Sequence, residues 1–267
     1  MMRSVHLSAE GLDLLVARLR AAGCVFAEDE AALLVEAAES ADALEVLVAR
    51  RTAGEPLEQL VGWVEFCGLR LAVAPGVFVP RQRTALLVRE AVMQVTAGSV
   101  LVDLGCGTGA IAAAAASAVP GLEVYAVDID PAAVACARRN LPPDRVFEGD
   151  LYAALPPALG GEVAVVVANA PYVPTDAIAL MPREARDHEL RVALDGGPDG
   201  LTVQRRVIAD ARAWLRPGGH VLIETGRGQL EGTGAALRSA GLEVTVSVDE
   251  ESGGVVVAGR NPSAGDA

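Results

Sequence analysis

The run Asp103-Leu104-Gly105-Cys106-Gly107-Thr108-Gly109 carries the strongest local signal for chemistry in this chain. Glycines let the backbone turn tightly and approach a ligand closely, and the start of a following helix offers free N–H groups. A second apolar segment ends at Asp128, where a carboxylate can hold ribose hydroxyls. These residue types in this order predict a site for a nucleoside-containing cofactor.

Two cofactor classes fit this pattern. Gly105-x-Gly107-x-x-Ala110 also matches the dinucleotide signature, with Asp128 as its acid. However, Asp103 precedes the first glycine by two residues, where a carboxylate suits a cationic amino-acid or sulfonium group better than a pyrophosphate. Gly109 also comes one residue before the third glycine of that signature. The pattern therefore favours S-adenosylmethionine, with S-adenosylhomocysteine as product, over NAD, and plain turn chemistry is the third interpretation.

Further candidates for cofactor contact follow the same strand ends. They are Cys106 within the glycine run, Ile129 after Asp128, and the pair Asp150 and Leu151 after a short strand near Val146. Asp150 could accept a hydrogen bond from an adenine amine, and its alternative role is a helix N-cap before Leu151.

The segment Asn169-Ala170-Pro171-Tyr172 is the candidate acceptor site. The Asn169 side-chain oxygen and the Ala170 carbonyl could each accept one hydrogen of an NH₂ group, Pro171 stiffens the turn, and Tyr172 could pack against a planar group. Gripping both hydrogens would favour a pyramidal transition state over a planar amide. Asn169 also counts as a candidate cofactor contact, because it ends a strand at the same edge. An ordinary Asn-x-Pro turn is the alternative for the tetrapeptide alone.

Alternating strands and helices must position these residues. We expect strands at 100–104, 124–127, near 146, and at 163–168, 220–224, 243–248 and 255–258, with helices at 110–118, 131–140 and 202–215. This alternation predicts a Rossmann-like α/β fold with a mostly parallel seven-stranded sheet and helices on both faces. The last two strands, separated only by DEESGG, predict an antiparallel edge hairpin.

The chain before residue 84 has a different pattern. Helical spacing over 8–22 and 29–51 predicts two helices in a unit of residues 1–53 that docks a substrate or partner. Residues 54–83 contain two alternating runs around Cys67-Gly68 and predict a hairpin linker. We expect the main domain over 84–260 and a polar tail over 261–267.

Composition excludes several classes of function. The net charge is −13, which disfavours nucleic acid as a direct substrate. All 22 basic residues are arginine, so Walker-lysine and lysine Schiff-base chemistry are excluded. The 4 cysteines and 3 histidines lack zinc-ligand spacing, so no metal site is expected. No apolar run approaches the roughly 20 residues of a membrane span, and the N-terminus differs from a signal peptide, so we expect no membrane association and a cytoplasmic location.

The longer motifs resemble those of the HemK/PrmC family, the release-factor glutamine methyltransferases. The similarity runs from about Gly54 to Gly226 and includes GEPLEQLVG, PGVFVPR, DLGCGTGAIA, AVDIDPAAVACARRN, NAPYVP, RDHELRVALDGGPDGL and WLRPGGHVLIETG. The resemblance implies a class I methyltransferase fold, S-adenosylmethionine as donor, and the tetrapeptide from Asn169 to Tyr172 as the site for an acceptor amide. It also implies a protein acceptor with an exposed glutamine, such as a peptide chain release factor.

The chain departs from the family pattern at three places. Ala170 replaces the first proline of Asn-Pro-Pro-Tyr, Gln82-Arg83-Thr84-Ala85 replaces Pro-Glu-Thr-Glu, and the helical unit before Gly54 is expected to be shorter than the family's docking domain. Despite these departures, we expect the chain to transfer methyl groups. The acceptor stays open between a release factor, another protein amide or amine, and a small molecule, and a non-catalytic binding protein is the alternative outside enzymes.

His188 and Glu189 are further pocket candidates, with a solvated loop as their alternative, and 195–200 is expected to be a turn beside the pocket.

Overall fold

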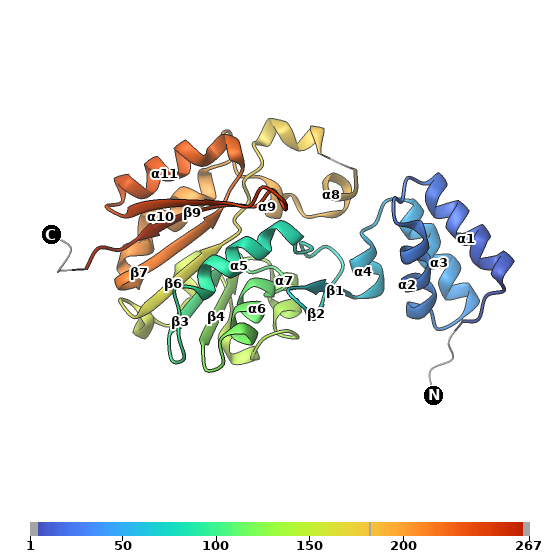
Figure 1. The fold of residues 1–267 in the computed structure, drawn as a ribbon, viewed down its shortest axis with the longest axis horizontal. Helices are drawn as coiled ribbons and strands as arrows, with labels where there is room; N and C mark the ends of the chain where they lie inside the picture. Colours follow the sequence, from blue (N-terminus) through green and yellow to red (C-terminus); the bar gives the residue numbers. More distant parts are fainter. Residues whose placement is uncertain (1–4, 182, 264–267) are drawn as a thin grey trace.

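The computed structural model describes residues 5–181 and 183–263 of the chain. A seven-stranded sheet with helices on both faces forms its larger part, and a group of helices at the N-terminal end stands apart from it (Figure 1). The first four residues of the predicted helical unit, and residues 264–267 of the predicted tail, lie outside the described residues.

The N-terminal unit consists of α1 (Ala9–Ala21), α2 (Ala27–Ala37) and α3 (Ala41–Thr52), followed by α4 (Leu57–Val61). The prediction of a single helix over 29–51 is wrong. Ala38 has extended backbone angles, and the Ser40 hydroxyl caps α3 by accepting a hydrogen bond from the Ala43 amide. The unit has its own apolar core, with Leu19, Leu34 and Val48 fully buried.

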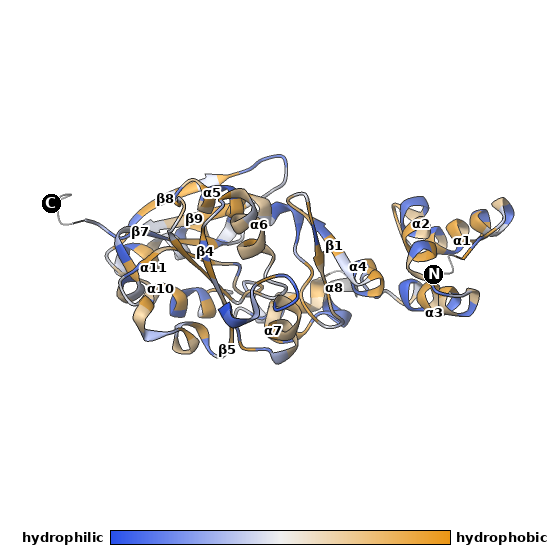
Figure 2. Cartoon of the chain, turned by 90° about the horizontal axis from the view of Figure 1, so that it is seen from below, coloured by the Kyte–Doolittle hydropathy of each residue, from blue (hydrophilic) through white to orange (hydrophobic). Residues whose placement is uncertain are grey.

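The predicted hairpin is confirmed. Strands β1 (Trp63–Phe66) and β2 (Leu69–Ala72) pair antiparallel, with Phe66 opposite Leu69. Cys67 and Gly68 both have positive φ, the geometry of a two-residue hairpin turn. In Figure 2, α4 and β1 lie between the N-terminal helices and the sheet.

The main sheet has the order β5-β4-β3-β6-β7-β9-β8. Five strands run parallel, and β9 pairs antiparallel with both β7 and β8, which confirms the predicted edge hairpin. The strands are β3 (Val100–Leu104), β4 (Glu123–Asp128), β5 (Val146–Glu148), β6 (Val163–Ala168), β7 (Leu215–Glu224), β8 (Glu243–Val248) and β9 (Val255–Arg260). Strand β7 begins five residues earlier than predicted, because Leu215 already pairs with Val163 before a register irregularity.

Two apolar layers cover the faces of the sheet. Helices α5 (Ala85–Val92), α6 (Ala110–Ala118) and α7 (Pro131–Ala137) pack on one face, and α10 (Thr202–Trp214) and α11 (Leu230–Ser239) pack on the other (Figure 1). Strand β6 shows the consequence, because all six of its residues are buried and they divide between the two layers. Helix α7 ends three residues before the predicted Asn140, whose side-chain amide instead donates to the carbonyls of Ala72 and Thr108.

Short segments complete the chain. Helices α8 (Arg183–His188) and α9 (Arg191–Leu194) follow β6, and short 3-10 helices occur at 82–84, 143–145, 151–154, 157–159, 175–180 and 227–229. Asn261, the first residue of the predicted tail, is buried and exchanges backbone hydrogen bonds with Gly218 and Gly219. Among the described residues no helix is both long and apolar enough to cross a membrane.

Candidate active site

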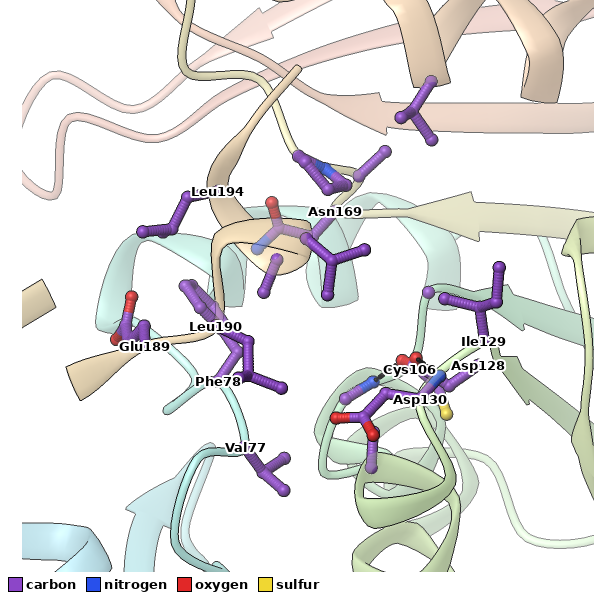
Figure 3. A pocket seen from close by; sticks show the side chains of 18 of the residues that line it. Val77, Phe78, Cys106, Asp128, Ile129, Asp130, Asn169, Glu189, Leu190 and Leu194 are labelled. Atoms are coloured by element: carbon purple, nitrogen blue, oxygen red, sulfur yellow. Dashed lines mark hydrogen bonds between the residues drawn. The ribbon is translucent and has the colours of Figure 1, made fainter. Parts of the chain in front are cut away.

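A pocket lies at the carboxyl edge of the parallel strands, where the fold places ligands. Its walls come from the loops after β3, β4, β5 and β6, from residues 76–84, and from 189–194 (Figure 3). In Figure 3, Cys106, Asp128, Ile129 and Asp130 lie on one side of the cavity and Asn169 lies across it, beside Leu190 and Leu194. The structure therefore brings the two predicted sites into one cavity.

The glycine-rich loop is fixed by Asp128. The Asp128 carboxylate accepts hydrogen bonds from the Gly107 amide at 2.8 Å and from the Asp130 amide at 3.0 Å. Gly105 and Gly107 have positive φ, which glycine adopts without strain. Burial raises the pKa of Asp128, and the two backbone amides oppose the rise. The carboxylate thus holds the loop in place and still lines the pocket.

Gly109 begins α6 in the left-handed conformation. A Cβ at this position would lie 2.7 Å from Cδ1 of Leu141, the end of a flexible side chain, and 3.3 Å from the Cβ of Ala137 in α7. Its backbone angles therefore favour glycine, and Gly109, unlike Gly105 and Gly107, does not line the pocket.

Asp103 lies beneath the loop and not in the pocket wall. Its side chain is fully buried, and Oδ2 accepts a hydrogen bond from the Ala112 amide at 3.2 Å. Burial, with a smaller effect from the neighbouring Asp128, raises the pKa of Asp103 to about 7. Asp103 can therefore influence a cationic ligand only through its field across the loop.

The other candidate cofactor residues all line the pocket, and their side chains differ in chemistry. Cys106 lines the pocket as a buried thiol, and burial raises its pKa well above the usual value, so it stays protonated. Ile129 and Leu151 also line the pocket. Asp150 occupies the N-cap position before Leu151 but makes no capping bond, and its Oδ2 accepts a hydrogen bond from Arg206 at 2.6 Å.

The acceptor tetrapeptide lines the opposite wall. Nδ2 of Asn169 donates to the Thr84 hydroxyl at 3.3 Å, which leaves Oδ1 as the acceptor end of the amide. Among the described residues, neither Asn169 Oδ1 nor the Ala170 carbonyl accepts a hydrogen bond. Both oxygens thus have no hydrogen-bond partner among the described residues, and both belong to residues that line the pocket.

Tyr172 is held at both ends. Its hydroxyl accepts a hydrogen bond from Arg83 at 2.5 Å, and its carbonyl accepts one from Gln229 at 2.8 Å. Burial, and then the negative charge of Glu224, raise the pKa of Tyr172, so the phenol stays neutral. The 195–200 turn packs against the same backbone, because a Cβ at Gly200 would lie 2.3 Å from the Tyr172 carbonyl.

Several residues of the site were not predicted as such. Thr84 and Glu224 are buried beside the acceptor motif, and Arg83 pairs with Glu224. Arg81 pairs with Glu189. Of the two further pocket candidates, Glu189 lines the pocket, whereas His188 does not line it and lies against Gly54. The only signal for Arg83 and Thr84 was their place in the run that departs from the family pattern.

Gln59 explains part of the GEPLEQLVG motif. Its side-chain amide donates to the Val77 carbonyl at 3.0 Å and accepts from the Gly76 amide at 3.2 Å. Val77 and Phe78 line the pocket, so Gln59 fixes a wall of the site from outside it.

The sheet order, the glycine loop after β3 and the acid that ends β4 define a class I methyltransferase fold. Residues 68–183 match the family model described as methyltransferase small domain. The crystal structure of a methyltransferase from Pyrococcus furiosus superposes with a TM-score of 0.55 at 18% identity, covering 73% of this chain and 90% of that chain.

The chain belongs to the release factor glutamine methyltransferase family. A member from Mycolicibacterium smegmatis is 45% identical over 190 residues, which is 70% of this chain and 67% of the relative. One from Geobacter sulfurreducens is 39% identical over 189 residues, covering 69% of this chain and 66% of the relative. The match thus spans about two thirds of the length of these relatives. A relative from Streptomyces pristinaespiralis, a 4-amino-L-phenylalanine/4-methylamino-L-phenylalanine methyltransferase, is 36% identical over 203 residues, 73% of this chain and 69% of the relative.

Proposed function

We propose that this chain is an enzyme that transfers a methyl group from S-adenosylmethionine to the side-chain amide nitrogen of a glutamine in a protein, with a peptide chain release factor as the acceptor. The observation that carries the proposal is a pair of oxygens that accept no hydrogen bond from the described residues, Asn169 Oδ1 and the Ala170 carbonyl, in residues that line the same cavity as the glycine-rich loop and Asp128. Family membership supports both the donor and the class of acceptor.

The residues present fit S-adenosylmethionine. Gly105 and Gly107, which line the pocket with positive φ, let the backbone approach a ligand closely. Asp128 presents a fixed carboxylate suited to ribose hydroxyls, Ile129 and Leu151 present apolar surface, and Asp150 presents an acceptor at the edge. When bound, the donor would supply an electrophilic methyl group on a sulfonium.

The acceptor residues would prepare the nitrogen. An amide lone pair is conjugated, so an ordinary amide is a poor nucleophile. Asn169 and the Ala170 carbonyl would each accept one N–H of the acceptor, which favours the pyramidal nitrogen of the transition state over the planar ground state. Tyr172, fixed by Arg83, would restrict the position of the planar group. Alignment supplies most of the rate enhancement, and no strong base is required because the nitrogen becomes acidic once methylated.

A small-molecule amine is the second candidate acceptor. The Streptomyces pristinaespiralis relative is named for an aromatic amino acid that carries a conjugated NH₂. The two oxygens, Asn169 Oδ1 and the Ala170 carbonyl, could hold such a group as well as an amide.

Methyl transfer assays with labelled S-adenosylmethionine test the proposal. Label should pass to a purified bacterial release factor, and 4-aminophenylalanine is the competing acceptor. Calorimetry should show binding of S-adenosylhomocysteine, whereas binding of NAD in its place would overturn the assignment of the donor site.

A further inference from the structure

Glu224 ends β7 directly beside the acceptor motif. Ala168, the last residue of β6, pairs with Ile223 in the parallel register, so Asn169 and Glu224 leave the sheet side by side. Glu224 is only 2% exposed and lies behind the pocket wall, not in it. A buried carboxylate at this place is costly unless it is paired and hydrogen-bonded.

The side chains around the Glu224 carboxylate come from the segment before α5 and from Tyr172 of the acceptor motif. Arg83 Nε donates to Glu224 Oε1 at 3.3 Å. Burial raises the pKa of Glu224, and the neighbouring Thr84 hydroxyl, the positive charge of Arg83 and the Tyr172 hydroxyl oppose the rise. Among the described residues, the second carboxylate oxygen, Oε2, has no hydrogen-bond partner of ordinary geometry. Thr84 and Arg83 also contact the acceptor motif, because Thr84 accepts from Asn169 and Arg83 donates to the Tyr172 hydroxyl.

The direction of these hydrogen bonds has a chemical consequence. The Thr84 hydroxyl has one proton, and a carboxylate beside it can only accept that proton. The hydroxyl oxygen is then left to accept from Asn169, which turns the amide so that Nδ2 points to Thr84 and Oδ1 is available to an acceptor. A carboxylate therefore selects the orientation of Asn169 that the proposed reaction needs.

We propose that Glu224 is a positioning residue of the acceptor site, acting on Asn169 through Thr84 and on Tyr172 both directly and through Arg83. The inference rests on the proposed function for its effect on rate. It also assigns a role to Arg83, which stands where the family pattern has a glutamate. The Arg83 guanidinium balances the charge of the buried Glu224 carboxylate and contacts both Glu224 and the Tyr172 hydroxyl.

Two variants test the network. Glu224→Gln keeps the size of the side chain and removes its charge, and Thr84→Val keeps the shape and removes the hydroxyl. Each should lower kcat on a purified release factor about tenfold, the effect of one lost hydrogen bond, with S-adenosylhomocysteine affinity unchanged. Thr84→Ser restores a hydroxyl and should restore kcat. Glu250→Gln is the matched control, because Glu250 is exposed and pairs only with Arg227 among the described residues.

The double variant Thr84→Val/Glu224→Gln distinguishes an effect of Glu224 that passes through Thr84 from two effects that are independent of each other. If Glu224 acts through Thr84, the double variant should lose no more than the larger single loss, whereas independent effects would multiply to about a hundredfold. A multiplied loss, or full activity of either single variant, would overturn the inference.

A second readout does not depend on activity. The Asn169 side-chain NH₂ signals in a nitrogen-15 NMR spectrum can be assigned by their loss in Asn169→Ala. They should move in Glu224→Gln and Thr84→Val and stay in place in Glu250→Gln. If the unaltered enzyme fails to methylate a release factor, the proposed function fails, and the network still stands or falls on whether these signals move.

Discussion

The backbone amide of Gly107 donates a hydrogen bond of 2.8 Å to Oδ2 of Asp128, and this bond joins the loop after β3 to the end of β4. The same carboxylate lines the pocket. Asp128 therefore acts twice, as a support for the loop and as a candidate partner for the donor.

Replacing Asp128 should weaken donor binding. Asp128→Ala is expected to lower S-adenosylmethionine affinity by about 1.5–3 kcal/mol, the range for a charge-assisted hydrogen bond. Isothermal titration calorimetry measures this directly. Asp144→Ala, at an exposed position in the 143–145 turn, is the control and should bind normally. Unchanged affinity in Asp128→Ala would mean that the ribose is held elsewhere.

Asp103 should make stability depend on pH. Its pKa is about 7 in the folded state, above the ordinary 3.8. Between pH 3.8 and pH 7 the carboxyl group is therefore protonated in the folded chain and ionised in the unfolded chain. Its contribution to the free energy of unfolding is present in full below about pH 4 and is lost as the pH rises through 7. The complete loss is on the order of 4 kcal/mol.

Asp103→Asn removes that loss. The variant should be more stable than the parent at pH 8 by roughly 1–3 kcal/mol, because an unsatisfied amide N–H offsets part of the gain. At pH 8, where Asp103 of the parent is ionised, the variant lacks a negative charge beneath the loop and should bind the cationic donor more weakly. Urea denaturation at pH 5 and pH 8 measures the first effect. Equal stability changes at both pH values would show that Asp103 is ionised throughout.

The sequence allowed the class of fold to be predicted because strand segments such as VAVVVA are apolar throughout and alternate with helical segments. Family membership and the fold class are confirmed. The break between α2 and α3 was missed, since the helical spacing continues across Ala38–Ser40 and only Ser40, the N-cap of α3, marks the start of the second helix.

The contacts of Arg83 and Glu224 that hold the acceptor motif in place could not be predicted from the sequence. Arg83 and Glu224 are 141 residues apart, and neither belongs to a local motif that signals the other. The position of Asp103 was also beyond spacing arguments, because its carboxylate faces the first turn of α6 and not the pocket. The roles given to the residues that line the site stay predictions.

Asn169 should be central to transfer. Asn169→Ala is expected to raise the barrier by about 2.7–4 kcal/mol, by analogy with the loss of one oxyanion-hole donor, while donor affinity stays normal. Asn169→Asp keeps an acceptor and should lose activity only in part. Single-turnover transfer of labelled methyl provides the rates, and near-normal turnover of Asn169→Ala would rule out the amide grip.

Ala170→Pro should be tolerated. The carbonyl, which the substitution retains, is the proposed gripping group, and the side chain at position 170 is buried against the sheet. Activity should therefore stay within about tenfold of the parent. A far larger loss would indicate that the Ala170 side chain itself is needed.

The N-terminal helices should affect acceptor choice and not donor binding. Leu34→Ala is expected to destabilise their separate core by about 2–5 kcal/mol. Leu14→Ala, at an exposed position on α1, is the matched control and should change stability by less than about 0.5 kcal/mol. Both variants should bind S-adenosylhomocysteine normally by calorimetry, and weaker binding in Leu34→Ala would show that the two units are energetically coupled.

The central claim is that a glutamine side-chain amide is the acceptor. Tandem mass spectrometry of a purified release factor, after incubation with the enzyme and S-adenosylmethionine, tests it most directly. The account predicts one added methyl group on the side-chain nitrogen of a glutamine, and no addition with Asn169→Ala. An unmodified release factor, with efficient methylation of 4-aminophenylalanine under the same conditions, would contradict it.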